Sequence, residues 1–595
     1  MQLSNKIVNI ICVVVLIFVF LISVLSMKGD ALTFDELAHL PAGYSYLTQK
    51  DYRLNPEHPP LVKDFSAIPL LFMNDINFPK DSPAWQEGSQ GRWWVQFNFG
   101  SDFLYRSGND ADKIIFWARV PMILILLFLG WFVFRWAKEL GGNKMALLSL
   151  IIFAFSPAFI ANGRFVTTDV AAALGAVLAT YYYLKFLKNP SKKNIIFGGL
   201  ALGISLLFKF SLILLFPFFA VITIVFICLT NGNKFKTLLK YLFSGFILLL
   251  LALGVIWVVY EYHMINYPSS LQYSETKAFL ETTAIPKSIV NLNLEMTKNP
   301  LTRPLAQYAE GLLMATNRTA TGNTTYFFGM VSAEGWWFYF PVVYFIKLPL
   351  AFHLLTLIAI LSSAVLIKII ILKEIFNEIK NWVRNHFTEF SMIIFVLIYW
   401  TTSMTSSLNI GVRHLMPSLP FIFILTCLGI SNFLNNIKKT PFKKAALILI
   451  IILLGWYVAS SLSVFPYFLT YFNEAVGGPK NGYKYVVDSN LDWGQDFKRL
   501  KSWMESNGVN KIYIDYFGGA DLDYYIKGKY VRWDGKKSPS ELPKGNYLAV
   551  SANQLQGGRA LALPDYKEKT DYYDWLNQYE PVAQIGNSIF VYYIK

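Results

Sequence analysis

Eleven apolar stretches constrain the fold of this chain more than any other feature. A helix needs roughly 20 apolar residues to cross the hydrocarbon core of a bilayer. The chain is 54% hydrophobic and 15% charged, which is typical of an integral membrane protein. We therefore predict an α-helical polytopic membrane protein with about eleven transmembrane helices. The stretches run approximately over residues 7–27, 114–134, 145–162, 170–187, 195–208, 211–230, 241–260, 340–367, 391–408, 417–434 and 445–468.

Basic residues divide unequally between the two sides of this predicted bundle. Alternate short loops, starting at the N-terminus, carry nineteen lysines and arginines, whereas those on the opposite side carry only Arg164, Lys209 and Arg413. Cytoplasmic loops hold the basic excess in membrane proteins, so we predict a cytoplasmic N-terminus in the plasma (inner) membrane. The net charge of +15 then reflects topology, and we expect no nucleic-acid partner. The nineteen are Lys6, Arg135, Lys138, Lys144, Lys185, Lys188, Lys192, Lys193, Lys234, Lys236, Lys240, Lys368, Lys373, Lys380, Arg384, Lys438, Lys439, Lys443 and Lys444.

Three long segments are predicted to lie outside the membrane, at 28–113, 261–339 and 469–595. The last alternates strand-like runs with helical stretches near 494–507 and 571–578, which indicates a small α/β domain. The strand-like runs are YKYVVD, KIYIDYF, NYLAV and SIFVYYI. We therefore expect a multi-spanning domain over 1–468 and an extracytoplasmic α/β domain over 469–595. Because the sequence has neither GxxxxGK[ST] nor GxGxxG at a strand-to-helix turn, a nucleotide-driven pump is not expected.

Ionisable residues gather on the predicted outer face. Carboxylates with cations at a membrane surface can both accept a proton from a hydroxyl and hold a departing phosphate. The group consists of Asp35 and Glu36, then Glu57, His58 and Lys63 in LNPEHPPLVK, then Arg164 and Asp169, then Lys209, and finally Arg413 and His414. Lys347 lies within the predicted span 340–367, where an ionisable group is costly and calls for an anionic partner.

Each of these residues also has a purely structural interpretation. Asp35 could mark the solvated start of a helix, and Asp169 could cap one. His58 could pin a loop that its prolines stiffen, while Arg413 and Lys347 could reach the interface along their own stems. The residue pattern by itself leaves both interpretations open.

Six segments occur in the same order as in a known group of enzymes. They are FDELAHLPAGYSYL, DYRLNPEHPPLVK, GRFVTTDVAAAL, GNTTYFFGMVSAEGWWFYFPVVYFIKLPL, GVRHLMPSLP and VDSNLDWGQDFKRL. Together they resemble polyprenyl-phosphate-dependent glycosyltransferases of the GT-C superfamily. The nearest likeness is to family 39-like enzymes, which include protein O-mannosyltransferases and lipid A aminoarabinose transferases. The likeness runs from the first span to about residue 500.

The resemblance implies a GT-C-like fold and a donor with one sugar on a polyprenyl phosphate. By motif position, Asp35 would be the base of an inverting transfer to an acceptor hydroxyl at the outer face, with Glu36 orienting it and Asp169 as the second acid. Residues implied near the donor phosphate are His58, Lys63, Lys209, Lys347, Arg413 and His414, with Glu57 and Arg164 as further outer-face candidates. The choice between Asp35 and Glu36 as base stays open.

Two other classes of function fit parts of the pattern. One is a flippase or transporter of lipid-linked saccharides, which would spread charged residues through the bilayer and use alternating halves. The other is a membrane protein whose tail binds cell-wall glycan. The sugar and the acceptor, whether protein, lipid or glycan, stay open. So does a divalent cation, which carboxylates can coordinate.

Overall fold

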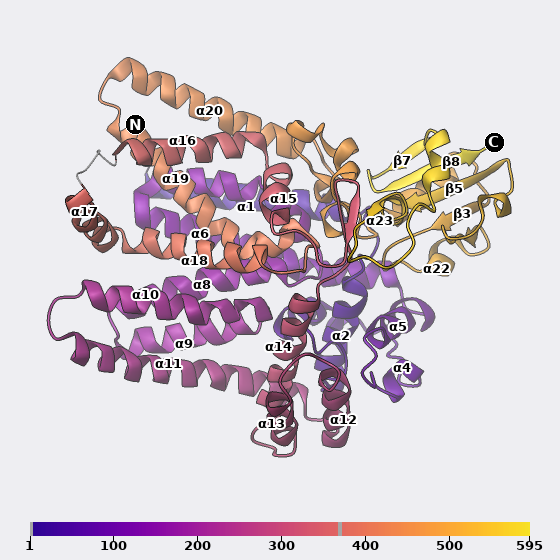
Figure 1. Cartoon of the computed structure of the whole chain (residues 1–595), viewed down its shortest axis with the longest axis horizontal. Helices are drawn as coiled ribbons and strands as arrows, with labels where there is room; N and C mark the ends of the chain where they lie inside the picture. The colour runs from indigo at the N-terminus through magenta and orange to yellow at the C-terminus, as the bar shows by residue number, and fades with distance from the viewer. Residues whose placement is uncertain (1–3, 367–371) are drawn as a thin grey trace.

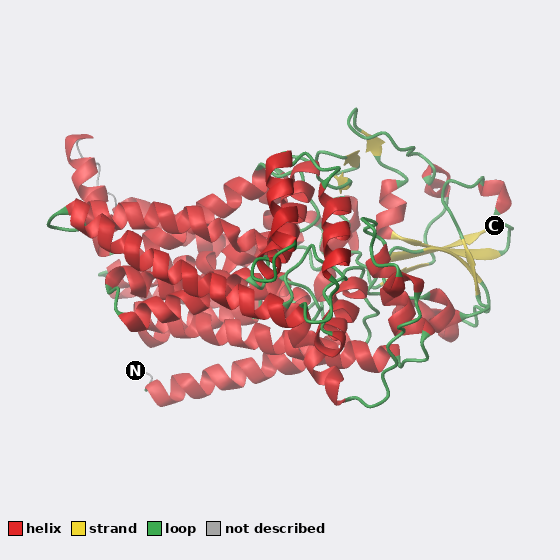
Figure 2. Cartoon of the chain, turned by 90° about the horizontal axis from the view of Figure 1, so that it is seen from below, coloured by secondary structure: helices red, strands yellow, loops and turns green. Residues whose placement is uncertain are grey.

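The computed structural model describes residues 4–366 and 372–595. Long helices form a bundle, and a small β-sheet lies beyond one end of it, with the N-terminus at the opposite end (Figures 1 and 2). We call these the sheet end and the N-terminal end of the bundle. The expected polytopic helical fold with a small C-terminal sheet region is confirmed.

Within the described residues, eight helical segments are long and apolar enough to cross a membrane, or nine if the bent pair α15 and α16 is one span. The bundle helices are α1 (Asn5–Met27), α6 (Ala111–Ala154), α8 (Asp169–Lys188), α9 (Lys192–Leu206), α10 (Leu215–Leu229), α11 (Lys234–His263), α15 (Tyr339–Lys347), α16 (Leu350–Leu366), α18 (Phe387–Met404), α19 (Leu419–Asn436) and α20 (Thr440–Leu462). Each of the eleven predicted stretches contains one of these helices or part of one. The end of the predicted span 340–367, together with Lys368, lies outside the described residues.

Helix α6 combines two of the predicted stretches. Its backbone is non-helical at Gly142, where φ is 75°, a value that glycine adopts without steric cost. A side chain at Gly130 would meet the Phe153 ring at 2.8 Å, although a straight helix would hold these residues about 35 Å apart at 1.5 Å per residue. The chain therefore folds back at Gly142. Helix α17 (Leu372–Asn385), which was not predicted, lies at the N-terminal end (Figure 1).

The first two long segments are folded and lie toward the sheet end (Figure 1). The 28–113 segment contains α2 (Glu36–Gln49), α3 (Leu61–Ala67), α4 (Pro83–Gln86) and α5 (Val95–Ser101). The 261–339 segment contains α12 (Ser269–Leu280), α13 (Lys287–Thr297), α14 (Arg303–Thr321), β1 (Thr325–Phe327) and β2 (Met330–Ser332). Their helices cover the end of the bundle where the site described below lies.

The C-terminal segment forms a five-stranded sheet with the order β4-β3-β5-β8-β7. Strand β3 pairs in parallel with β4 and β5, whereas β8 pairs antiparallel with β5 and β7. The short β6 pairs instead with β2, which ties the tail to the 261–339 segment. The elements are α21 (Phe497–Ser506), β3 (Ile512–Asp515), α22 (Leu522–Ile526), β4 (Tyr530–Arg532), β5 (Asn546–Ser551), α23 (Ala552–Gly557), β6 (Leu561–Ala562), β7 (Ala583–Ile585) and β8 (Ile589–Ile594).

Three of the four predicted strands are confirmed as β3, β5 and β8. The prediction of a strand at YKYVVD, residues 483–488, is wrong. The first two residues of this run end a 3-10 helix (Pro479–Lys484), and the Val486 and Val487 that follow are buried. Its only strand-like pairing within the described chain is a single bridge from Val486 to Phe327. The apolar side chains of this run pack in the large core cluster that includes the bundle. The predicted helix 494–507 is α21, whereas 571–578 yields only a 3-10 turn (Asp574–Gln578).

Candidate functional site

Two carboxylates and two cations meet at the sheet end of the bundle. Nη1 of Arg413 lies 2.8 Å from Oδ2 of Asp35 and 3.3 Å from Oδ2 of Asp169. Nζ of Lys209 lies 2.6 Å from Oδ1 of Asp169. We call Asp35, Asp169, Lys209 and Arg413 the acidic cluster. Its members come from four separate regions of the chain, and all four belong to the ionisable group expected on the outer face.

The two carboxylates differ in access to solvent. The Asp169 side chain is fully buried, and both of its oxygens face cations of the cluster. The Asp35 side chain is 24% exposed, and Arg413 is the ion-pair partner recorded for it in the described chain. Solvent therefore reaches the Asp35 carboxylate, whereas the Asp169 carboxylate is enclosed beside Lys209 and Arg413.

Local structure places both acids at helix starts. Asp169 is the first residue of α8, and Asp35 is the residue that precedes α2. A carboxylate is favoured there by the positive end of the helix dipole. The backbone before Asp35 is held by the tail, because the amide of Phe34 donates to the carbonyl of Trp493 at 3.0 Å and that of Ala31 to Gln495 at 2.8 Å.

Glu36 does not share the site with Asp35. Its oxygens accept hydrogen bonds from Nε and Nη2 of Arg119 at 2.8 and 2.6 Å. They also accept from the Val166 amide at 2.9 Å and from both the amide and the hydroxyl of Thr33. The carboxylate is fully buried. Glu36 thus anchors the first long segment to α6. None of its side-chain hydrogen bonds in the described chain reaches Asp35, which it was expected to orient.

Lys63 holds the LNPEHPPLVK loop from inside. Its ammonium donates to Tyr46 Oη, to the carbonyls of Asn55 and His58, and to Asn55 Oδ1, at 2.8 to 3.0 Å. The residue is fully buried, and this burial lowers its pKa well below the usual value. The Lys63 ammonium therefore donates its hydrogen bonds to groups of its own segment, whereas the resemblance implies a contact with a donor phosphate.

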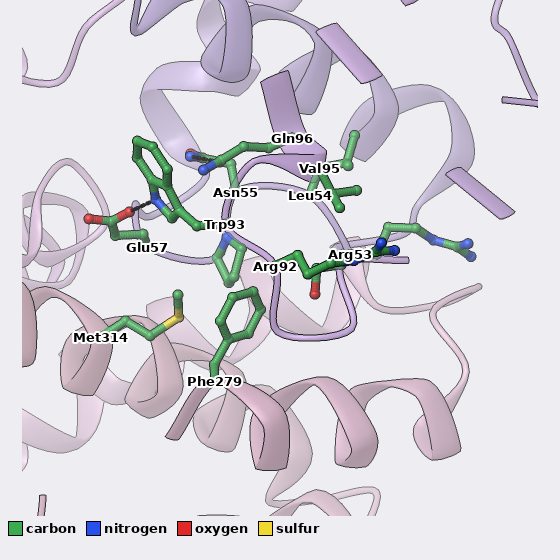
Figure 3. A pocket seen from close by; sticks show the side chains of 12 residues that line it. Arg53, Leu54, Asn55, Glu57, Arg92, Trp93, Val95, Gln96, Phe279 and Met314 are labelled. Atoms are coloured by element: carbon green, nitrogen blue, oxygen red, sulfur yellow. Dashed lines mark hydrogen bonds between the residues drawn. The ribbon is translucent and has the colours of Figure 1, made fainter. Parts of the chain in front are cut away.

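Glu57 lies in a narrow cleft between the 28–113 segment and helices α12 and α14 (Figure 3). Its carboxylate accepts from Nε1 of Trp93 at 2.6 Å and from Nη1 of Arg318 at 2.7 Å. The cleft has a volume of about 10 Å³, which is room for roughly one water molecule. None of the four acidic-cluster residues lines it. Glu57 therefore joins two segments rather than facing the acidic cluster.

Arg164 and Lys347 each contact groups outside the acidic cluster. Arg164 pairs with Asp30 at 3.0 Å, not with Asp169, and burial lowers its pKa to about 10. Lys347 donates to the carbonyls of Leu469 and Asn490 at 2.8 and 2.6 Å, and no ion pair from it to a carboxylate is found among the described residues. These two residues thus have structural partners.

Histidines surround the acidic cluster. The rings of His39 and His58 meet edge to face at 4.9 Å, and Nδ1 of His39 lies 2.9 Å from the Val166 carbonyl. Burial lowers the pKa of both rings, so they are neutral at pH 7. Nε2 of His414 is buried with no hydrogen-bond partner among the described residues, which leaves it available to a ligand.

Sequence reasoning missed four residues near the site: His39, Arg318, Asp488 and Ser489. His39 follows Asp35 by four positions, a spacing that puts both on one helical face. Asp488 and Ser489 lie in VDSNLDWGQDFKRL, a segment already used for the resemblance. Arg318 occupies NRT, a sequence that reads as a glycosylation acceptor but lies in the helix α14.

A metal site finds no support in the described geometry. Over residues 4–366 and 372–595, no group of three or more histidine, cysteine, aspartate or glutamate side chains is arranged to hold an ion. Each carboxylate oxygen of Asp169 is within 3.3 Å of a cation. Within the described chain the acidic cluster is thus balanced by lysine and arginine.

Comparison with known proteins gives one family match and several remote structural likenesses. Residues 111–257 match the family described as dolichyl-phosphate-mannose-protein mannosyltransferase. No curated protein matches the chain significantly.

Three solved structures illustrate the remote likenesses. ArnT from Cupriavidus metallidurans, solved with undecaprenyl phosphate, is 12% identical with a TM-score of 0.45, and the alignment covers 99% of this chain and 98% of ArnT. The oligosaccharyltransferase AglB from Archaeoglobus fulgidus, solved with an inhibitory peptide and a dolichol phosphate, is 11% identical with a TM-score of 0.45, covering 91% and 69%. The S. cerevisiae Pmt1-Pmt2 protein O-mannosyltransferase complex, solved with its sugar donor, is 19% identical with a TM-score of 0.30, covering 48% and 38%.

The family match spans helices α6 to α11 and includes Asp169 and Lys209 of the acidic cluster. It is independent of the motifs at Asp35 and Arg413, which lie outside the matched residues. Over residues 111–257, the family match agrees with the resemblance to polyprenyl-phosphate-dependent glycosyltransferases of the GT-C superfamily.

Proposed function

We propose that the protein transfers a sugar from a polyprenyl-phosphate-linked monosaccharide to an acceptor hydroxyl, with inversion at the anomeric carbon. The observation that carries this proposal is the pairing of Asp35, the more accessible carboxylate of the acidic cluster, with Arg413. The proposal assigns the general base to Asp35, because Asp169 is buried and Glu36 is saturated by Arg119 and backbone amides.

The charges of the acidic cluster suit such a displacement. Two carboxylates and two cations sum to zero before reaction. Asp35 takes the proton of the acceptor hydroxyl, the hydroxyl oxygen forms a bond to the anomeric carbon, and the bond from that carbon to the phosphate oxygen breaks. The electron pair of the broken bond stays on the phosphate. Once Asp35 is protonated, Arg413 has lost a negative partner at the moment when the leaving phosphate gains charge.

Lys209 and Arg413 are the proposed phosphate contacts. Both are at least nine-tenths buried, so their charges are little screened by water, and fixed charges in such a site stabilise a developing anion strongly. Burial lowers the pKa of the His414 and His58 rings, and an uncharged imidazole beside these cations can both donate and accept a hydrogen bond. The proposal drops Lys63 and Lys347 from this role, because backbone carbonyls use their ammonium groups.

We propose further that the sheet end faces the outside of the plasma membrane. The basic excess of nineteen residues against three supports this orientation. It would let a lipid-linked donor serve as the activated sugar without a nucleotide on that side.

Reconstituted transfer tests the proposal. Purified protein in vesicles receives a panel of polyprenyl-phosphate sugars and hydroxyl acceptors, and consumption of each donor lipid is followed. We expect one donor to release polyprenyl phosphate with wild-type protein and not with Asp35→Asn. Movement of an intact donor across the bilayer without release would instead support the flippase class. Glycan binding without donor release or donor movement would support a membrane protein whose tail binds cell-wall glycan.

A further inference from the structure

The C-terminal segment reaches into the acidic cluster and contacts Arg413 at two points. Nε of Arg413 donates to Oγ of Ser489 at 3.0 Å, and the guanidinium carbon lies 4.2 Å from the ring centroid of Trp493. Ser489 and Trp493 are 2% and 1% exposed. We infer that Ser489 and Trp493 are positioning residues for the donor phosphate, because they hold Arg413 in the orientation that presents it to the leaving group. This inference rests on the proposed function.

The hydroxyl of Ser489 has a defined direction. Its proton goes to the Ile410 carbonyl at 2.6 Å, which leaves a lone pair toward Nε of Arg413. The approach is close, because a Cβ atom at Gly411 would collide with Oγ of Ser489. Gly411 thus gives the C-terminal turn access to the guanidinium.

These contacts leave one nitrogen of Arg413 for a ligand. Ser489 takes Nε, the cluster carboxylates take Nη1, and the Trp493 ring covers one face. No hydrogen bond from Nη2 is recorded to any described residue. Because a planar guanidinium held at these points cannot turn freely, Nη2 has a defined direction. Arginine uses such fixed geometry to bind phosphate oxygens, and prior orientation lowers the entropic cost of binding.

The turn that carries Ser489 is itself clamped to the membrane helices. Oδ1 of Asn490 accepts a hydrogen bond from the Val412 amide at 2.9 Å, and Nδ2 of Asn490 donates one to Oη of Tyr339 at 2.9 Å. Its carbonyl accepts from the buried ammonium of Lys347 at 2.6 Å. Lys347 therefore needs no anionic ligand, since it ties this turn to α15. The clamp makes the tail a component of the site and not only a domain beside it.

A double-mutant cycle tests whether Ser489 acts through Arg413. Ser489→Ala is compared with wild type and with the same change in an Arg413→Lys background, because lysine has no Nε to donate to Ser489. We expect Ser489→Ala to lower kcat/KM for the donor lipid about tenfold, as for a hydrogen bond to a charged group. In the Arg413→Lys background the same change is expected to cost less than about twofold. Ser502→Ala, on the exposed part of α21, is the matched control.

Each alternative outcome is distinct. Equal fold losses in both backgrounds would make Ser489 merely structural and would overturn the inference. Unchanged kcat and KM in Ser489→Ala with an active wild type would overturn it while the proposed function stands. An inactive wild type would overturn both. If Ser489→Ala does not fold, Trp493→Phe keeps an apolar ring. It is expected to lower Tm by a few degrees because it leaves a small cavity, and to raise the donor KM and lower kcat of the folded protein; unchanged constants would again contradict the inference.

Discussion

The guanidinium of Arg413 lies 2.8 Å from the carboxylate of Asp35, although 378 positions separate the two residues in the chain. This contact joins the proposed base to the proposed phosphate-binding cation. In the proposed reaction, this ion pair would couple proton uptake by Asp35 to the gain of negative charge on the leaving phosphate.

Replacement of the proposed base has a specific kinetic signature. Asp35→Asn keeps the shape of the side chain but cannot accept the proton, so we expect kcat to fall by about 10²- to 10⁴-fold with donor KM little changed. Turnover of donor lipid by purified protein measures both constants. Asp75→Asn, an exposed acid in the same segment, is the control. Near-normal kcat in Asp35→Asn would remove the base assignment.

For Glu36, we expect replacement to reduce folding stability and not to act first on turnover. Glu36→Gln leaves the buried Arg119 without its countercharge, and breaking a buried ion pair costs about 3–5 kcal/mol of folding free energy. We expect a lower Tm and a lower yield of folded protein, measured by thermal unfolding in detergent. A variant with wild-type Tm and no turnover would instead return Glu36 to the list of candidate bases.

The two cluster cations differ from exposed lysines in their expected effect. Lys209→Ala and Arg413→Ala should each raise donor KM and lower kcat, by about tenfold or more in kcat/KM, since the leaving phosphate gains charge as its bond breaks. Arg413→Lys should lose less than Arg413→Ala, because it keeps the charge. Lys113→Ala, an exposed residue of α6, should change neither constant. Unaltered constants in both alanine variants would exclude this phosphate site.

A buried acid outside the acidic cluster predicts pH-dependent stability. Burial raises the pKa of Glu310 to about 8 from a usual value of 4.5, so the folded state binds this proton more tightly than the unfolded chain. Stability from this group is complete below about pH 4.5 and is lost as pH rises toward 8. Glu310→Gln should therefore raise Tm at pH 8 more than at pH 5. Glu295→Gln, on the exposed side of α13, should show no such difference.

Labelling with a membrane-impermeant thiol reagent tests the orientation. In a Cys228→Ser background, Ser540→Cys lies in the exposed part of the tail and Asn231→Cys lies in the exposed loop between α10 and α11. We expect reagent added outside intact cells to label residue 540 and not residue 231. The reverse pattern would contradict both the topology and an outward-facing site.

Several features of the fold follow from local sequence. Apolar length determines where helices can cross a bilayer, and all eleven predicted stretches contain helix. Alternation of residues predicted β3, β5 and β8 correctly. The same signal failed at YKYVVD, because the packing of Val486 and Val487 in a core shared with the bundle overrides strand propensity.

The sequence by itself determined the membrane class, the apolar helical stretches and the four ionisable residues of the acidic cluster as part of a larger candidate set, because apolar length and motif order are properties of contiguous residues. Only the tertiary structure decided how that set divides. The Asp35 carboxylate is partly exposed, whereas that of Glu36 is buried against Arg119. The Lys209 ammonium pairs with Asp169, whereas that of Lys347 donates to backbone carbonyls of the tail. These distinctions depend on burial and on hydrogen-bond partners from distant segments. A charged residue has the same letter in a loop clamp and in a site, so its role is determined by the groups that surround it after folding.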